Sequence, residues 1–594
     1  MKRLFILLAA WAVISPSFSA YYVAGNGGQG NPWCDGKNWQ ANGSLMASEG
    51  NLSTITFSAV PAGSYQFKIT NGTWDRNWGF TNFDQLHSNI QAIGNGDGNV
   101  CFQTTEQQNL TITFDGSAIC LQGDGHNELD TADVAVIGVP SEYEGVMLQG
   151  FYWDSYTTSN RKYSDTKWAT LDANYADAIA EDFDLIWLPP SGYGGGVGYY
   201  TKTYSNQGSA WGSKQALRSL IGNLHSKGVK VIADIVINHR QSASGWAQSF
   251  TPENFEGYGT WQITSEHICS GDEAFTDSGS DSRSLPHGNA DTGDNDGGCR
   301  DLDHTSEYVQ DYIKAYLNWM RDSMQYDGWR YDMVKGYSGS FVSKYNLSSE
   351  PFFSVGEYWD GDASALKMYL QSAKYNTTVF DFCLKFTLNS SIGVGSYSKL
   401  KAAGMRSIGL EKYAVTFIDN HDTFERSDNQ GSEFIGYNKV LSSNRPKILQ
   451  ANAYLLMMPG TPCVFWPHWY TFRDEIHELI ALRKAAGIHN ESVVTDESAS
   501  GSAYSATVNG HNGSIVLRMG SGRDTNVPAG YTLAITGPNM EIYMSAGVNY
   551  TPSVITSVNN IELPSSLYRK FMENGHLYIE CNGSVYDALG RQIR

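Results

Sequence analysis

Three acidic residues in separate segments of the chain have the types and positions that catalysis needs. Asp332 ends Gly-Trp-Arg-Tyr-Asp, Glu357 ends Val-Gly-Glu, and Asp422 ends Phe-Ile-Asp-Asn-His-Asp. Each lies at the end of a short apolar run of the kind found in buried parallel strands. A (β/α)8 barrel brings the ends of several strands to one face, so distant carboxylates can meet there. Carboxylates are the groups that acid-catalysed cleavage of a glycosidic bond requires.

The pattern of residues 145–488 predicts such a TIM barrel, because short apolar runs alternate with stretches of helical periodicity. Residues 240–300, after the third expected strand, are rich in Gly, Asp, Asn and Ser. They are too many for an ordinary loop, so we expect an inserted subdomain there. The expected barrel strands are 146–150, 185–188, 229–237, 329–332, 353–356, 378–382, 414–419 and 461–465.

Segments of a different texture flank the expected barrel. Residues 21–130 alternate in the manner of short strands and predict a β-sandwich, and residues 489–545 predict a C-terminal antiparallel β-domain. Residues 546–594 form a tail that is either a sorting segment or an ordinary terminal hairpin. The aromatic segment 464–470 is either a sugar contact or packed core.

Residues 1–20 have the order of a secretory signal peptide: Lys2 and Arg3, an apolar run over 4–14, then small residues. The apolar run is shorter than the roughly 20 residues of a spanning helix, which disfavours a membrane anchor. We therefore expect a secreted protein, extracellular, on the cell surface or periplasmic. The 8 cysteines suit an oxidising compartment, and we expect the within-module disulfides Cys101–Cys120 and Cys269–Cys299.

Composition narrows the partners. The 61 Asp and Glu against 41 Lys and Arg leave a formal net charge of -20, which repels nucleic acid and anionic membrane surfaces. Aromatic residues reach 13%, with 16 Trp and 35 Tyr, whereas charged residues are only 17%. This balance suits a protein that binds neutral sugars by stacking and hydrogen bonds.

Five short segments, in this order, carry a resemblance to a known family. They are Asp234-Ile-Val-Ile-Asn-His-Arg, Arg300-Asp-Leu-Asp-His, Gly328-Trp-Arg-Tyr-Asp-Met-Val-Lys-Gly-Tyr, Val355-Gly-Glu and Phe417-Ile-Asp-Asn-His-Asp. With them, residues 145–490 resemble the barrel of an alpha-amylase of glycoside hydrolase family 13. The ending Lys335-Gly336-Tyr337 is closer to the plant-type branch, because animal and fungal members typically have His where Gly336 stands.

The resemblance implies a role for each carboxylate. Asp332 would be the nucleophile of a retaining mechanism, Glu357 the acid and base, and Asp422 the third carboxylate that holds sugar hydroxyls. Burial and nearby negative charge should raise the pKa of Glu357. Arg330, two residues before Asp332 and on the same face of the strand, should keep the nucleophile ionised.

The resemblance also implies substrate and metal contacts. His239 and His421 would hydrogen-bond sugar hydroxyls, Tyr199 would stack beneath the cleaved unit, and Lys335 would reach the leaving-group side. Ordinary packing or a solvated charge is the alternative for these side chains. A calcium ion would be held by oxygens of Asn238, Asp291 and Asp301 and by the carbonyls of Asp294 and Gly336, with a flexible acidic loop as the alternative.

Residues 60–68 and 71–74 look like parts of the starch-binding modules attached to many amylolytic enzymes. Four tryptophans of the expected β-sandwich, residues 21–130, either stack on glucose or fill the core: Trp33, Trp39, Trp74 and Trp78.

The sequence thus predicts an endo-acting, retaining alpha-amylase that cleaves α-1,4 bonds in starch, glycogen or maltooligosaccharides and is a monomer. A glucanotransferase or branched-glucan (pullulan) hydrolase, and a non-hydrolytic starch-binding protein, are the alternatives.

Overall fold

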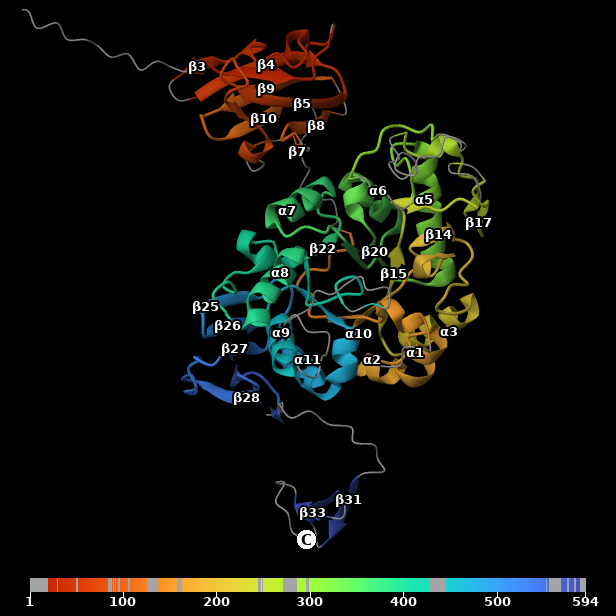
Figure 1. Ribbon diagram of the computed structural model, residues 1–594, viewed down its shortest axis with the longest axis vertical. Helices are drawn as coiled ribbons and strands as arrows, with labels where there is room; N and C mark the ends of the chain where they lie inside the picture. The colour runs from red at the N-terminus through yellow and green to blue at the C-terminus, as the bar shows by residue number, and fades with distance from the viewer. Residues whose placement is uncertain are drawn as a thin grey trace, which may run out of the picture. The chain divides into compact units, whose positions relative to one another are not determined.

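The computed structural model divides into two compact units, Met1–Val136 and Ile137–Arg594 (Figure 1). It describes residues 20–28, 30–49, 52–83, 88, 90, 92–94, 97–104, 107–124, 137–157, 163–243, 247, 249–270, 286–294, 299–424, 426, 444–551, 553–554, 568–573, 576–581 and 584–587. The predicted signal peptide therefore lies almost wholly outside the described residues. Among the described helices, none is both long and apolar enough to cross a bilayer.

The first unit contains two antiparallel sheets. One has the order β2-β1-β5-β8-β7, with β6 paired to β5, and the other has the order β10-β9-β4-β3. On β5, Tyr65, Phe67 and Ile69 are buried while the residues between them face outward, as a period of two requires. The bounds are β1 Tyr22–Gly25, β2 Ser44–Leu45, β3 Ala47–Glu49, β4 Leu52–Val60, β5 Gly63–Thr70, β6 Asn77–Trp78, β7 Ala92–Gly94, β8 Val100–Thr104, β9 Gln108–Phe114 and β10 Ile119–Gly123.

The second unit is built on a closed parallel barrel of β11-β12-β15-β20-β21-β22-β23-β24. The pairing of Met147 with Cys463 closes it between the first and last strands. Every strand predicted for the barrel is present, and the predicted fold class is confirmed. The bounds are β11 Met147–Gln149, β12 Leu185–Leu188, β15 Lys230–Ile235, β20 Gly328–Tyr331, β21 Phe353–Gly356, β22 Thr378–Phe380, β23 Ala414–Phe417 and β24 Thr461–Phe465.

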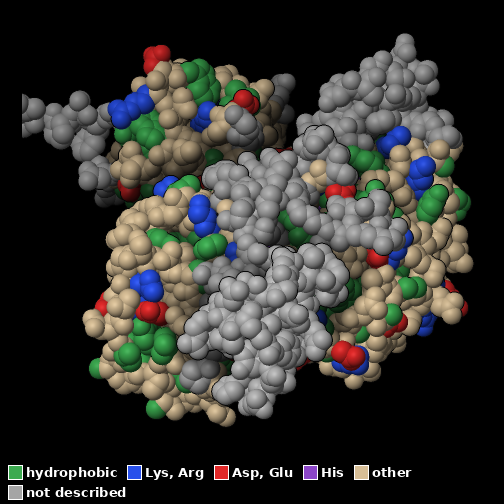
Figure 2. All heavy atoms as spheres, turned by 60° about the horizontal axis from the view of Figure 1, so that its bottom comes forward, with side chains coloured by type: hydrophobic (Ala, Val, Ile, Leu, Met, Phe, Trp, Pro, Cys, Tyr) green, Lys and Arg blue, Asp and Glu red, His purple; other side chains and the backbone are tan. Residues whose placement is uncertain are grey.

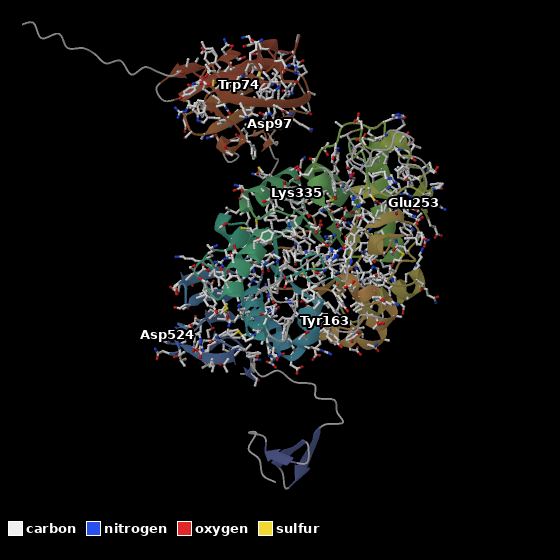
Figure 3. The ribbon with its side chains drawn as sticks, viewed as in Figure 1. Trp74, Asp97, Tyr163, Glu253, Lys335 and Asp524 are labelled. Atoms are coloured by element: carbon white, nitrogen blue, oxygen red, sulfur yellow. The ribbon has the colours of Figure 1, made fainter. Side chains whose placement is uncertain are left out.

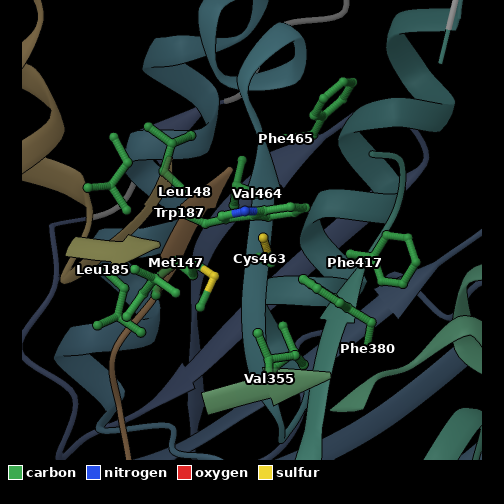
Figure 4. Packing of buried hydrophobic residues seen from close by; sticks show 14 of the residues in the cluster. Met147, Leu148, Leu185, Trp187, Val355, Phe380, Phe417, Cys463, Val464 and Phe465 are labelled. Carbon is green, nitrogen blue, oxygen red and sulfur yellow. The ribbon is translucent and has the colours of Figure 1, made fainter. Parts of the chain in front are cut away.

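Nearly all residues of these strands are buried, because side chains on one side fill the barrel and those on the other meet the helices. Figure 4 shows part of the interior, where Trp187 lies near Cys463, with Met147, Val355 and Phe380 around them. The interior is therefore packed, which fixes the directions in which the strand ends present their side chains.

Helices follow the strands and surround them (Figure 1). In α3, Ser213 caps the first turn through a hydrogen bond from the Ala216 N–H, and the buried residues recur at helical spacing as Leu217, Leu220, Ile221 and Leu224. The bounds are α1 Trp168–Asn174, α2 Ala176–Asp182, α3 Lys214–Ser226, α5 Glu307–Trp319, α6 Gly339–Ser349, α7 Ala363–Ser372, α8 Phe382–Ser390, α9 Arg445–Met457, α10 Trp466–Thr471 and α11 Arg473–Ala486.

Short hairpins on the barrel shape the region around the strand ends. β13 (Tyr193–Gly195) pairs with β14 (Tyr200–Thr203) after β12, and β16 (His239–Arg240) pairs with β19 (Arg300–Asp301) at the two ends of the insert. Within the insert, β17 (Glu253–Phe255) pairs with β18 (Gly259–Trp261). The fully buried Arg240 guanidinium lies 2.8 Å from Glu253, which ties the insert to the chain that leaves the third barrel strand.

A six-stranded sheet, β25-β26-β27-β29-β28-β30, follows α11. Three further strands, β31-β32-β33, pair with one another near the C-terminus. The bounds are β25 Val493–Ala499, β26 Tyr504–Gly510, β27 Gly513–Met519, β28 Tyr531–Gly537, β29 Met540–Ser545, β30 Ser553–Val554, β31 Tyr568–Glu573, β32 His576–Cys581 and β33 Ser584–Asp587.

The predicted disulfide partners lie within single units. Cys101 is on β8 and Cys120 on β10, which belong to different sheets of the sandwich, and each alternates with buried neighbours and so faces away from the other sheet. Cys101 is a free cysteine in the structure, so the predicted Cys101–Cys120 disulfide is wrong. Cys269 and Cys299 are both buried, and the Cys269 N–H donates to the Asp301 carbonyl at 2.9 Å, so their segments run side by side. The Cys269–Cys299 pairing stays a prediction.

Figure 2 shows one face, on which the described Lys, Arg, Asp and Glu side chains are scattered among uncharged ones. No broad basic area of the kind that binds nucleic acid is present in the described part of that face.

Candidate active site

The centre of the site is the buried guanidinium of Arg330 on β20. Parallel pairing aligns Arg330 with Asp234 on β15 and with Val355 on β21, so the ends of three strands meet around it. Its Nη1 lies 2.7 Å from Asp234 Oδ1 and 2.6 Å from Asp332 Oδ1, and its Nη2 lies 2.8 Å from Glu357 Oε2. One cation therefore holds two of the three predicted catalytic carboxylates side by side.

Asp332 and Glu357 are each only 7% exposed. Three carboxylates around one guanidinium carry an excess of negative charge, which a buried site relieves by keeping a proton. Burial raises the pKa of Glu357 to about 8, against the opposing effect of Arg330 and with help from Asp332 and Asp422. The Glu357 carboxyl is thus able to carry a proton at neutral pH.

Asp234 is a buried member of this cluster to which the sequence analysis assigned no role, although it opens one of the quoted segments. Burial raises the pKa of Asp234 to about 7, while Arg330 acts to lower it. Its Oδ2 accepts hydrogen bonds from Trp187 Nε1 at 3.1 Å and from the Tyr199 hydroxyl at 2.9 Å. These bonds fix both aromatic rings beside Arg330.

Asp422 lies in the turn that follows β23. Asn420 Oδ1 accepts hydrogen bonds from the backbone N–H groups of Asp422 and Thr423, at 3.0 and 2.9 Å, which fixes the turn. The Asp422 carboxylate lies 3.1 Å from His421 Nε2 and 3.1 Å from Arg426 Nη1. It is more exposed than the other two carboxylates, as a group that meets substrate hydroxyls would be.

His421 links Asp422 to the rest of the site. The Gln149 amide nitrogen is assigned as the donor to His421 Nδ1, at 2.9 Å, so the ring proton lies on Nε2. Nε2 faces the Tyr199 hydroxyl oxygen at 2.8 Å and the Asp422 carboxylate. Burial, with the positive charges of Arg330 and Arg426, holds the pKa of His421 well below its usual range. The imidazole is therefore neutral and donates through Nε2.

Tyr199 and Trp153 form an aromatic pair at the site. Their rings are parallel, with an interplanar angle of 6° and centroids 6.0 Å apart, and the Arg426 guanidinium lies 3.4 Å from the Trp153 centroid. The sequence analysis proposed Tyr199 but missed Trp153 and Gln149. Gln149 ends the first barrel strand and Trp153 follows it, which is the signal that could have found them.

The structure separates the other two predicted substrate contacts. His239 is buried, and its Nε2 lies 2.9 Å from the Tyr199 carbonyl oxygen, so it borders the site through the backbone of that residue. Lys335 lies instead 3.0 Å from Asp360 Oδ2 and over the Tyr358 ring, on the segment that follows Glu357 (Figure 3).

The residues proposed for calcium also converge. Asn238 Nδ2 lies 3.1 Å from Asp301 Oδ1, and a Cβ placed on Gly336 would lie 1.9 Å from Asn238 Oδ1. The Asp294 N–H donates to the Lys335 carbonyl at 2.7 Å, which brings the segment 291–294 against Gly336. Asn238 Oδ1 is buried without a hydrogen-bond donor among the described residues. An oxygen-only set of carboxylates, an amide and carbonyls fits a hard cation.

Comparison with known proteins agrees with this geometry. Residues 174–468 match the family model described as "Alpha amylase, catalytic domain". The chain is 29% identical over 423 residues to "Probable alpha-amylase 2" of Arabidopsis thaliana, a match that covers 67% of this chain and 93% of that protein. It is 28% identical over 444 residues to "Alpha-amylase 3, chloroplastic" of the same plant, covering 70% of this chain but only 46% of the relative.

Among solved structures, an alpha-amylase from Anoxybacillus superposes with a TM-score of 0.51 at 15% identity, covering 69% of this chain and 100% of that one. At this identity the likeness shows the fold alone.

Proposed function

We propose that this chain hydrolyses internal α-1,4-glucosidic bonds of starch, glycogen and maltooligosaccharides with retention. The premise is that residues 174–468 form a catalytic domain of the alpha-amylase family, so that the chain is a glycoside hydrolase. The observation that carries the proposal is the single guanidinium of Arg330 between Asp332 and Glu357, at 2.6 and 2.8 Å. Two carboxylates that share one guanidinium are close neighbours, as the nucleophile and the acid of a retaining enzyme must be.

The reaction has two displacements. An ionised Asp332 oxygen attacks the anomeric carbon while the bond from that carbon to the bridging oxygen breaks, and Glu357 gives its proton to the departing oxygen. Water then attacks the same carbon, the ionised Glu357 takes a proton from that water, and the bond to Asp332 breaks. Both side chains return to their starting states. The net reaction cleaves the glycosidic bond and adds one water molecule across it.

The neighbouring side chains position the sugar at the cleaved bond. Asp422 presents an acceptor to sugar hydroxyl groups and favours the distorted ring of the transition state. The neutral His421, whose Nε2 faces Asp422 and the Tyr199 oxygen, orients both of these side chains. Tyr199 offers a ring fixed by its hydrogen bond to Asp234. Arg330 holds the Asp332 carboxylate at 2.6 Å, while the raised pKa of Glu357 keeps that side chain protonated.

A calcium ion would be held by Asn238, Asp291 and Asp301, with the carbonyls of Asp294 and Gly336. When bound, it would supply charge neutralisation and a cross-link among the third strand end, the insert and the segment after Asp332. The contact between Gly336 and Asn238 supports this site.

We also propose that the protein is secreted, acts as a monomer and holds polymeric starch through its N-terminal unit. The order of Lys2, Arg3 and the apolar run 4–14 supports secretion. Mass spectrometry of the mature N-terminus and light scattering of the purified protein test the first two statements.

The proposed reaction is tested with soluble starch, maltoheptaose and pullulan, followed by chromatography of the products and NMR of the newly formed anomeric centre. Short maltooligosaccharides of mixed length, released first in the α configuration, are the expected result. Products longer than the substrate would identify a glucanotransferase, pullulan cleavage a branched-glucan hydrolase, and no products a binding protein.

A further inference from the structure

The N-terminal unit has an open hollow of 470 Å³ on its surface. It is lined by Trp39, Gln66, Lys68, Trp74, Asp97 and Asn99. Two aromatic rings over a floor of polar side chains are the groups that bind sugars, because rings stack on the apolar faces of glucose while amides and charges meet its hydroxyls.

Two of the four tryptophans within residues 21–130 pack against other aromatic rings instead. Trp33 is 0% exposed, and its ring lies against Phe57 and Phe67. Trp78 is half-buried and packs against Phe114, with Arg76 over its ring. Neither lines the hollow, which is lined instead by Trp39 and Trp74.

Trp74 is exposed and Trp39 is half-buried, and both line the hollow. Trp74 is 46% exposed and stands in the turn between β5 and β6, where Thr73 donates a hydrogen bond to Asn71 (Figure 3). Trp39 has a φ of 48°, a conformation that bulky residues rarely adopt, and its N–H donates to the Gly25 carbonyl at 2.7 Å. This hydrogen bond holds Trp39 in a strained conformation, with its ring beside that of Trp74. Strained backbone conformations of this kind are associated with functional sites.

The floor of the hollow comes from the outward face of β5. Gln66 and Lys68 alternate with the buried Phe67, and Asn99 Nδ2 lies 3.3 Å from Gln66 Oε1. Lys68 and Asp97 bring opposite charges to the lining, so the hollow as a whole favours a neutral ligand with many hydroxyl groups over an ionic one.

The angle between the two rings selects the kind of sugar chain. The ring centroids of Trp39 and Trp74 are 6.4 Å apart, and their planes are tilted by 42°. Neighbouring glucose units of an α-1,4 chain turn relative to one another along a helix, whereas those of a β-1,4 chain form a flat ribbon. A tilted pair follows the turning chain.

We propose that Trp39 and Trp74, with Gln66, Lys68, Asp97 and Asn99, form a binding site for α-1,4-glucan chains, separate from the catalytic carboxylates. The proposal rests on the starch-hydrolysing function proposed above. It names the residues through which the N-terminal unit would bind polymeric starch.

The test uses the full-length chain with Asp332→Asn, so that bound polymer is not degraded. Trp74→Ala and the double variant Trp39→Ala/Trp74→Ala are compared with the matched control Leu52→Ala. Leu52 is an apolar side chain of the same unit and is 46% exposed, as Trp74 is. Binding to granular starch and to cellulose is measured by sedimentation. The expected result is a Kd for starch weakened at least about tenfold by Trp74→Ala and further by the double variant. Leu52→Ala should bind as its parent does, Trp74→Phe should retain part of the affinity, and cellulose should bind weakly throughout.

Starch binding by the double variant equal to that of its parent would overturn the proposal, as would equal binding of cellulose. An unchanged affinity with a lowered melting temperature would make the two rings structural. The same tryptophan variants, made with Asp332 intact, should hydrolyse maltoheptaose at the parental rate. If the parent itself does not cleave maltoheptaose, the proposed function fails independently of the binding result.

Discussion

At the scale of single residues, Arg330 organises the site. It lies within 2.8 Å of Asp234, Asp332 and Glu357, and burial makes each of these contacts stronger than it would be in water. A single cation cannot neutralise three anions, so Glu357 keeps a proton while Asp332 receives one of the shortest contacts. The different roles proposed for these two chemically similar acids rest on this arrangement.

Asp332→Asn should lower kcat by on the order of 10⁴-fold or more, because an amide is not a nucleophile toward the anomeric carbon. Glu357→Gln should be as damaging on starch, but much less so in the first step on a maltoside with an acidic phenol as leaving group, which departs without a proton. Burst kinetics on that maltoside separate the two variants. Equal losses on both substrates for both variants would contradict the assigned roles.

The pH dependence follows from the raised pKa of Glu357. The acid form is the active one, and with a pKa of about 8 it is abundant at neutral pH and is lost as the pH rises through that value. The kcat/KM should therefore fall about tenfold per pH unit above the transition. A pH profile with maltoheptaose measures this. A basic limb near pH 5, where an ordinary glutamate titrates, would contradict it.

At the scale of elements, the strand ends determine which residues can meet. Asp234 ends in the same layer as Arg330 because β15 and β20 pair in register, and the next strand places Glu357 beside them. The insert is fastened to this layer at both ends by β16 and β19. The proposed calcium ligands sit at that junction.

Removal of calcium should lower the melting temperature by roughly 5 °C, because an ion bound only by the native state stabilises it by about 3 kcal/mol at a hundredfold excess over Kd. Calorimetry with and without a chelator measures the change. Asp301→Asn should melt at the same temperature in both conditions, whereas the exposed Asp311→Asn should still respond to the chelator. An unchanged melting temperature of the parent, with metal loss verified by elemental analysis, would rule out the site.

At the scale of the whole molecule, the C-terminal sheet is joined to the barrel by polar contacts as well as by apolar packing. Glu497 on β25 lies 2.8 Å from the Arg406 guanidinium and accepts a hydrogen bond from the Tyr504 hydroxyl at 2.6 Å. The rings of Tyr454 on α9 and Tyr504 on β26 meet at 5.4 Å. The sheet therefore stabilises the helices that surround the catalytic strands.

Glu497→Ala should lower the stability of the barrel by about 3 kcal/mol, because it leaves the mostly buried Arg406 without its counter-charge. The urea midpoint for loss of maltoheptaose hydrolysis measures this, since it reports on the barrel while the change lies in the sheet. Asp311→Ala, which breaks an exposed pair with Lys314, should lower the free energy of unfolding by less than about 0.5 kcal/mol and so leave the midpoint nearly unchanged. Equal midpoints for both variants would mean that the two parts unfold independently.

The sequence by itself was enough to predict the barrel, the order of its strands and the three carboxylates at their ends. Apolar runs and helical periodicity are local signals, and the chemistry of a residue at a strand end is evident from its type. The same local signals could not decide the fate of aromatic residues: Trp466 and Trp469 are buried core, whereas Trp74 is exposed.

Only the tertiary structure decided which charges share a neighbour and which rings stay accessible. The triple contact of Arg330, the tautomer of His421 and the pairing of Lys335 with Asp360 depend on residues that are distant in the sequence. Burial and electrostatic environment are properties of the packed whole, because each depends on every group that folding brings near. That is the physical reason why Trp33 is fully buried while Trp39, six positions away, lines an open hollow.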